Sequence, residues 1–96
     1  MNFYIIGTVV KLKNEQKVMI TGYYPIIIEE KQIFDYLGCM YPEGVLDSKQ
    51  NIFFDKNDIS EVLWNRTIND RNEKIIIKLN LFEKSNQKEM IQKKLI

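Results

Sequence analysis

Cys39 is the side chain best suited to nucleophilic chemistry, and it is the only cysteine in the chain. A catalytic cysteine must reach its thiolate form, so it needs a neighbouring base or cation and access to substrate. The sequence contains no histidine, and Cys39 lies in "DYLGCMYPEG" among alternating apolar residues, where a free cysteine behaves as a small buried hydrophobe. We therefore predict a buried thiol and no catalytic residue. A lone cysteine cannot form an internal disulfide, which is typical of a reducing cytoplasm.

Carboxylates are the second group with potential chemistry, as acid–base pairs or as ligands of a hard cation. Asp58 and Glu61 have the spacing of a capping box, in which Asp58 caps a helical turn and Glu61 reaches back to it. "DKND" (55–58) lacks the glycine and the bidentate glutamate of a calcium loop, and the glycines form no phosphate-binding motif. We expect no metal, no cofactor and no enzymatic activity. The other carboxylates considered are Asp35, Glu43, Asp47 and Asp55.

The length and composition are those of one small domain. The chain has 96 residues, of which 45% are hydrophobic and 28% charged. A net charge of +1 gives no general attraction to nucleic acid or anionic lipid. The longest apolar run, 25–28, is far shorter than the roughly 20 residues that span a bilayer. The N-terminal "MNFYIIGTVV" lacks the features of a signal peptide. We predict a cytoplasmic location.

Alternation of apolar and polar residues predicts five short strands, which must position these side chains. Residues 5–13 and 18–24 form a hairpin around a polar turn, and the first strand turns Ile6, Thr8, Val10 and Leu12 to one face. The segments "IFDYLGCM", "NIFF" and "EVLWNR" supply three more strands, with a helical turn just before the last. "YPEG" suits a type I turn, and "IIIEEKQ" is interpreted as a strand end that runs into a connection. The pattern predicts a mainly β (α+β) fold, a small antiparallel SH3-like β-barrel over residues 1–66.

Residues 67–96 predict a C-terminal helical segment that packs on the barrel or extends from it. Apolar residues recur at helical spacing, and Asn69 or Asp70 is available as N-cap. The β-branched run "III" favours a strand instead, so residues 74–82 leave two alternatives, of which we favour the helix. Residues 87–96 fit either one more short helix or a terminal segment that is disordered in isolation.

Apolar residues outnumber the inward-facing positions in two segments. Ile26, Ile27 and Ile28 cannot all face inward in an extended segment, because alternate side chains point to opposite faces. The C-terminal helix is apolar over more than one packing stripe. A covering helix over an open barrel end accounts for some of these residues, and the surplus would form the kind of exposed patch that marks a partner surface. The predicted partner-binding residues are Tyr23, Tyr24, Ile26, Ile27, Ile28, Ile75, Ile76, Leu79 and Phe82.

A small barrel rich in aromatic residues also suggests nucleic-acid binding. Bases could stack on exposed tyrosines, and lysines of the first hairpin could contact phosphates. Glu15 interrupts that lysine cluster, however, and the overall charge is nearly balanced. We therefore expect no nucleic-acid partner and keep this function as the alternative. The residues concerned are Tyr23, Tyr24, Tyr41, Lys11, Lys13 and Lys17.

Three blocks of the sequence resemble a small domain-of-unknown-function family of Gram-positive bacteria. They are "IGTVVKLKNEQKVMITGYYP", "FDYLGCMYPEGV" and "FFDKNDISEVLW", and the resemblance covers residues 5–66. The family is similar in gene context to accessory factors of type VII secretion, and it is found beside polymorphic toxins with LXG-type N-terminal domains.

This resemblance implies a non-enzymatic cytoplasmic chaperone or adaptor. Such a protein would bind a secreted toxin with an LXG-type N-terminal domain before export and deliver it to the membrane secretion ATPase, so that it is recruited to the membrane through the secretion machinery. The family implies no catalytic residues. The segment "EKIIIKLNLFEK" departs from the family's usual acidic C-terminal helix, because it is more apolar and more basic. The sequence leaves open the identity of the toxin and whether the protein forms a homo-oligomer.

Overall fold

The first hairpin forms as its alternating pattern predicts. In the computed structural model, which describes residues 3–42, 51–65 and 70–96, strand β1 (Val9–Leu12) pairs antiparallel with β2 (Lys17–Tyr23). The side chains of Thr8, Val10 and Leu12 are buried, but Ile6 is 44% exposed. Ile6 departs from the predicted face because the chain turns at residues 6–7 before β1 begins.

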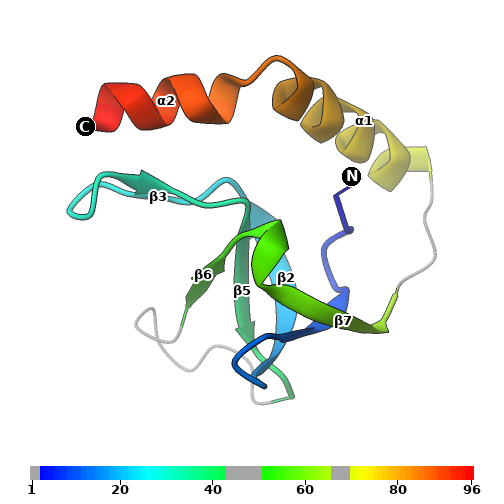
Figure 1. Cartoon of the computed structure of the whole chain (residues 1–96). Helices are drawn as coiled ribbons and strands as arrows, with labels where there is room; N and C mark the ends of the chain where they lie inside the picture. The colour runs from blue at the N-terminus through cyan, green and yellow to red at the C-terminus, as the bar shows by residue number, and fades with distance from the viewer. Residues whose placement is uncertain (1–2, 43–50, 66–69) are drawn as a thin grey trace.

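Five strands form one antiparallel sheet (Figure 1). Within the described residues this sheet is open, so the α+β class is confirmed but no strand pairing closes the predicted barrel. The strand order is β6-β5-β2-β1-β7, with β5 at Tyr36–Met40, β6 at Ile52–Phe54 and β7 at Ile59–Trp64. Closure would require the edge strands β6 and β7 to pair. β6 has only three residues, and β7 follows β1 with two register shifts, which are devices that bend an edge and end its pairing.

A separate two-stranded hairpin lies between β2 and β5. It consists of β3 (Ile26–Ile27) and β4 (Gln32–Ile33), with Ile26 opposite Ile33. The segment "IIIEEKQ" is therefore a hairpin, whereas the sequence indicated a strand end and a connection.

A 3-10 turn at Lys56–Asp58 precedes β7, as predicted, but its cap differs from the prediction. Asp55 is the N-cap residue, and its backbone N–H donates to the carboxylate of Asp58 at 2.8 Å. The predicted Asp58–Glu61 box is thus displaced by three residues towards the N-terminus. Glu61 lies in β7 and its carboxylate is 3.6 Å from the ammonium of Lys11. The shift arises because residue 59 already begins the strand.

Two helices complete the α+β fold and lie along one side of the molecule (Figure 1). They are α1 (Asp70–Lys84) and α2 (Gln87–Leu95). The predicted helix over residues 74–82 is therefore confirmed against the strand alternative, and within residues 87–96 the second helix extends to Leu95. Asp70 is already helical, while Asn69 lies outside the described residues. Among the described residues, no helix is long and apolar enough to span a membrane.

The core joins the sheet, the N-terminal segment and α1. Phe3 packs with buried residues of four strands, including Val18, Ile20 and Tyr36, and Ile76 and Leu79 of α1 pack against this cluster. These α1 residues and Phe3 cover apolar surface that strand closure would have covered in a barrel.

The most specific sequence block, "DYLGCMYPEG", is only partly described. Cys39 is buried in β5, as predicted. Gly38 lies where a Cβ atom would be 2.9 Å from the carbonyl oxygen of Met19 and nearer still to Val18 Cγ1. The Tyr41–Pro42 peptide bond is cis. Residues 43–44 lie outside the described residues, and with them the predicted type I turn.

Candidate functional site

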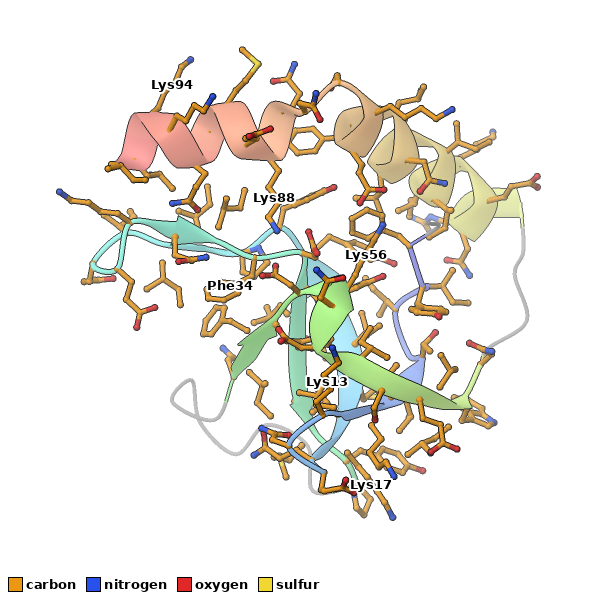
Figure 2. All side chains as sticks on the ribbon, viewed as in Figure 1. Lys13, Lys17, Phe34, Lys56, Lys88 and Lys94 are labelled. Atoms are coloured by element: carbon orange, nitrogen blue, oxygen red, sulfur yellow. The ribbon has the colours of Figure 1, made fainter. Side chains whose placement is uncertain are left out.

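An ionic cluster joins the sheet to both helices. The Lys88 ammonium of α2 donates to the carboxylates of Asp35, at 2.8 Å, and Asp55, at 2.9 Å. The Lys56 ammonium donates to Glu83 of α1 at 2.7 Å and lies 3.8 Å from the centre of the Phe3 ring. Lys88 points from α2 towards the sheet, whereas Lys94 points away from it (Figure 2).

The cluster contains two lysines and three carboxylates, so each ammonium has at least one carboxylate partner. Asp35 is 8% exposed, and its other carboxylate oxygen accepts the backbone N–H of Lys56 at 2.9 Å. Partial burial acts to lower the pKa of the Lys88 ammonium, but hydrogen bonds to Asp35 and Asp55 and their negative charges outweigh burial and raise that pKa. Lys88 is therefore a cation throughout the neutral pH range, and its role here is structural.

A pocket of about 450 Å³ lies beside the cluster, between α2, the end of α1 and the β3–β4 hairpin. Its lining includes Tyr24, Ile33, Glu83 and Gln92. Burial, followed by the negative charges of Asp35 and Glu83, raises the pKa of the Tyr24 hydroxyl. That hydroxyl has no hydrogen-bond partner within the described part of the chain.

The described residues contain no cluster of the side chains that usually bind metal ions. No group of three or more cysteine, aspartate and glutamate side chains is placed to hold a metal ion within residues 3–42, 51–65 and 70–96. The Cys39 side chain is 2% exposed, so a substrate has no direct route to the thiol. Of the six carboxylates considered for acid–base chemistry, Asp35 and Asp55 bind Lys88, and Asp58 accepts a backbone hydrogen bond in the 3-10 turn. Glu61 lies near Lys11, and Glu43 and Asp47 lie outside the described residues.

The aromatic residues proposed as partner or base contacts mostly pack inside the molecule. Tyr23 donates its hydroxyl to the Tyr4 carbonyl at 2.7 Å. The ring centres of Tyr24 and Phe82 are 4.6 Å apart, and both tyrosine rings lie against Phe3. Tyr23, Tyr24 and Phe82 thus connect the N-terminal segment, β2 and α1, and their ring faces are largely used in these contacts.

The isoleucines and the leucine of the predicted partner surface divide into two groups. Ile76 and Leu79 pack against the core, and Ile27 is half-buried in β3. Ile26 and Ile28 are 47% and 73% exposed, and Ile75 is 39% exposed. The structure therefore brings Ile26 and Ile28 together on the β3–β4 hairpin but does not join all nine predicted residues into one exposed patch.

The outer surface of α1 carries two apolar side chains of the predicted surplus that were not among the predicted partner-binding residues. Ile77 and Leu81 are 51% and 61% exposed, and their i, i+4 spacing puts them side by side on the helix. The exposed residues Lys74, Lys78 and Lys84 border them. We call these five residues the outer α1 face. The i, i+4 spacing of residues 77 and 81 could have placed both on one side of the helix, opposite Ile76 and Leu79. That assignment was not made from the sequence.

Charge is divided unevenly along the chain. Residues 70–96 contain seven basic and four acidic residues, a net charge of +3, whereas residues 1–69 contain seven basic and nine acidic residues, a net charge of −2. The near-zero total hides this division. The basic excess is small in α1, which has four basic and three acidic residues, and larger in α2, which has three basic residues and one acidic residue.

Comparison with known families identifies the first three quarters of the chain. The family model described as "Domain of unknown function (DUF4176)" matches residues 3–76. The chain belongs to the DUF4176 family. The match extends from the N-terminal core residue Phe3 to Ile76 in the middle of α1, so the last two turns of α1 and all of α2 lie beyond it. No curated protein and no solved structure gives a significant match.

Proposed function

We propose that this DUF4176 protein is a non-enzymatic adaptor that binds a type VII secretion toxin before export and delivers it to the secretion machinery. The proposal combines the resemblance of its three sequence blocks to a family found beside LXG-type toxins with one structural observation. That observation is the outer α1 face, where Ile77 and Leu81 lie exposed at i, i+4 spacing among lysines. An apolar pair of this kind on a helix is a common anchor in helix-mediated binding.

The position of this face suggests how different toxins are distinguished. Ile77 and Leu81 lie just beyond the segment that matches the family model, which ends at residue 76. The inward side of α1 packs on the core through Ile76, which is inside the family match, and Leu79, which lies beyond it. We propose that the outward half of the helix carries the choice of toxin, while the inward half belongs to the fold.

The chemistry of the face indicates the chemistry of the toxin segment. The basic residues of the helices favour an acidic partner, because complementary charge accelerates association and rejects like-charged segments. The apolar pair favours a partner helix with its own apolar stripe. We therefore expect the toxin segment to be an acidic amphipathic helix. If the partner is an LXG-type toxin, its N-terminal domain should contain such a helix.

Nucleic-acid binding remains the second candidate, and the basic excess of the two helices is the observation that favours it. The first hairpin is less suited to this function than the sequence indicated. Lys11 lies 3.5 Å from Glu15 and 3.6 Å from Glu61, so its charge is already partly compensated. Tyr41 is 45% exposed, but Tyr23 and Tyr24 pack internally.

Co-purification tests the proposal directly. The tagged protein is expressed together with the LXG-type toxin encoded beside its own gene, and the bound material is analysed for protein and for nucleic acid. The adaptor function predicts that the toxin is retained through a high-salt wash, because an apolar contact contributes to binding. Recovery of nucleic acid without toxin, lost as salt rises, would support the second candidate and contradict the first.

A further inference from the structure

The helix α2 is attached to the rest of the molecule mainly through polar side chains. None of its residues is buried. Lys88 makes the two ion pairs with Asp35 and Asp55. Gln92 accepts the Ile33 backbone N–H at 2.9 Å and donates to the Lys31 carbonyl at 2.6 Å. The Gln92 amide thus forms hydrogen bonds with backbone groups at the edge of β4, as a neighbouring strand would.

The helix α1 also has one ion pair with the rest of the molecule, Lys56–Glu83, but it adds apolar contacts with the core. Ile76 and Leu79 pack on the core, and Phe82 contacts the Tyr24 ring. Ion pairs weaken as salt screens them, whereas screening does not weaken apolar contacts, which carry no charge. Salt screening should therefore weaken the attachment of α2 more than that of α1, which keeps its apolar contacts with the core.

The junction between the helices allows them to move separately. The described chain passes from α1 to α2 through Ser85 and Asn86, and Asn86 has a left-handed backbone with φ of 58°. Asparagine tolerates that conformation better than most residues do. The pocket of about 450 Å³ beneath the start of α2 shows that this end is not closely packed on the hairpin.

We infer that α2 is a strap that opens as a unit about Ser85–Asn86 when Lys88 loses its hold on Asp35 and Asp55, while α1 stays in place. Opening frees the Ile33 N–H and the Lys31 carbonyl at the edge of β4, and it gives water access to the pocket beside Tyr24. A detached helix of nine residues is too short to persist alone in water, so opening also unfolds α2. This inference does not depend on which partner the protein binds.

Residue-resolved amide hydrogen exchange on the full chain tests the strap. We expect Lys88→Ala to speed exchange of the α2 amides and of the Ile33 amide by at least about tenfold, since hydrogen bonds to charged groups are lost. Amides of residues 76–84 in α1 should keep their wild-type rates. Lys93→Ala is the matched control, because this exposed α2 lysine makes none of the contacts that hold the helix, and it should change nothing.

A second measurement covers the case in which Lys88→Ala disturbs the whole fold. Raising salt to about 1 M, where the screening length falls to roughly 3 Å, should speed exchange in α2 and at Ile33 of the unaltered chain and leave α1 unchanged. The inference is overturned if α1 and α2 respond together in the salt series. It is overturned equally if both Lys88→Ala and high salt leave the Ile33 amide protected.

Discussion

The ammonium of Lys88 lies 2.8 Å from the carboxylate of Asp35, although the two residues are separated by 53 positions in the chain. This contact joins the last helix to the start of the "DYLGC" strand. Asp55 completes the cluster from the residue before the 3-10 turn. Asp35 thus connects the start of β5 with the 3-10 turn and with α2. These contacts explain why an acidic side chain lies among apolar residues.

Asp35→Ala should destabilise the protein through this cluster. It removes an acceptor from the Lys56 backbone N–H and one of the two carboxylates from Lys88. We expect the free energy of unfolding to fall by about 1–3 kcal/mol, the usual range when a buried polar group loses its partner. Urea denaturation measures this change. In Glu61→Ala, which removes an exposed partner of Lys11, the loss should be under about 1 kcal/mol. Equal effects of the two substitutions would contradict the assigned role of Asp35.

Gly38→Ala should also destabilise the fold, for a steric reason. The added methyl group would meet Val18 and the Met19 carbonyl of the neighbouring strand, and such overpacking lowers the free energy of unfolding by about 1–3 kcal/mol.

Gly22→Ala provides the matched control for this substitution. A Cβ atom there would lie 3.5 Å from Leu37, which is ordinary contact. This variant should be near-neutral, because alanine also reduces the freedom of the unfolded chain. A Gly38→Ala variant as stable as Gly22→Ala in the same urea titration would show that β2 and β5 separate easily, contrary to the structure.

Alkaline pH should destabilise the protein through its tyrosines. Burial raises the pKa of Tyr23 from 10.0 to about 12, and it raises the pKa of Tyr24 and Tyr36 as well. The folded state therefore favours the neutral phenols. Their contribution to stability is fully present below the unfolded pKa of about 10 and is lost as pH rises through the folded values.

Tyrosinate absorbance followed against pH measures this effect. In the folded chain, these three tyrosines should ionise only well above pH 10, whereas in urea all five should ionise near the ordinary value of about 10. Stability measured in parallel should decline from about pH 10 upwards. Superimposable titrations of the folded and unfolded chains would show that the hydroxyls are hydrated and would contradict the packing described here.

Much of the secondary structure was predictable because it follows local patterns. The alternation in 18–24 predicted β2, and the helical recurrence of apolar residues outweighed the β-branched "III". The alternation in "IFDYLGCM" predicted β5 only from Tyr36 onwards, because Ile33 belongs to β4 of the separate hairpin. Barrel closure was not predictable in the same way. Closure depends on whether the edge strands β6 and β7 pair with each other. No local pattern in the sequence predicts that α1 and Phe3 pack on the sheet.

The candidate site was less predictable than the fold. The surplus of apolar residues was recognised, but Ile76 and Leu79 were assigned to the partner surface although they lie on the core. A rotation of a few residues around the helix decides between inside and outside, and only the packed structure fixes that rotation. The role of Lys88 was not predictable from local sequence, because its carboxylate partners lie 33 and 53 residues away along the chain.

The outer α1 face is the central claim, and the affinity of the LXG-type toxin for Leu81→Asp tests it most directly. We expect the dissociation constant to rise about 10- to 100-fold, as when an apolar anchor at an interface centre is lost, with an unchanged melting temperature. Gln87→Asp, which introduces the same charge at an exposed position of α2, should bind normally, while Ile76→Asp should lower the melting temperature. If Leu81→Asp binds the toxin as tightly as the unaltered chain, the outer α1 face is not the docking surface and the account is wrong.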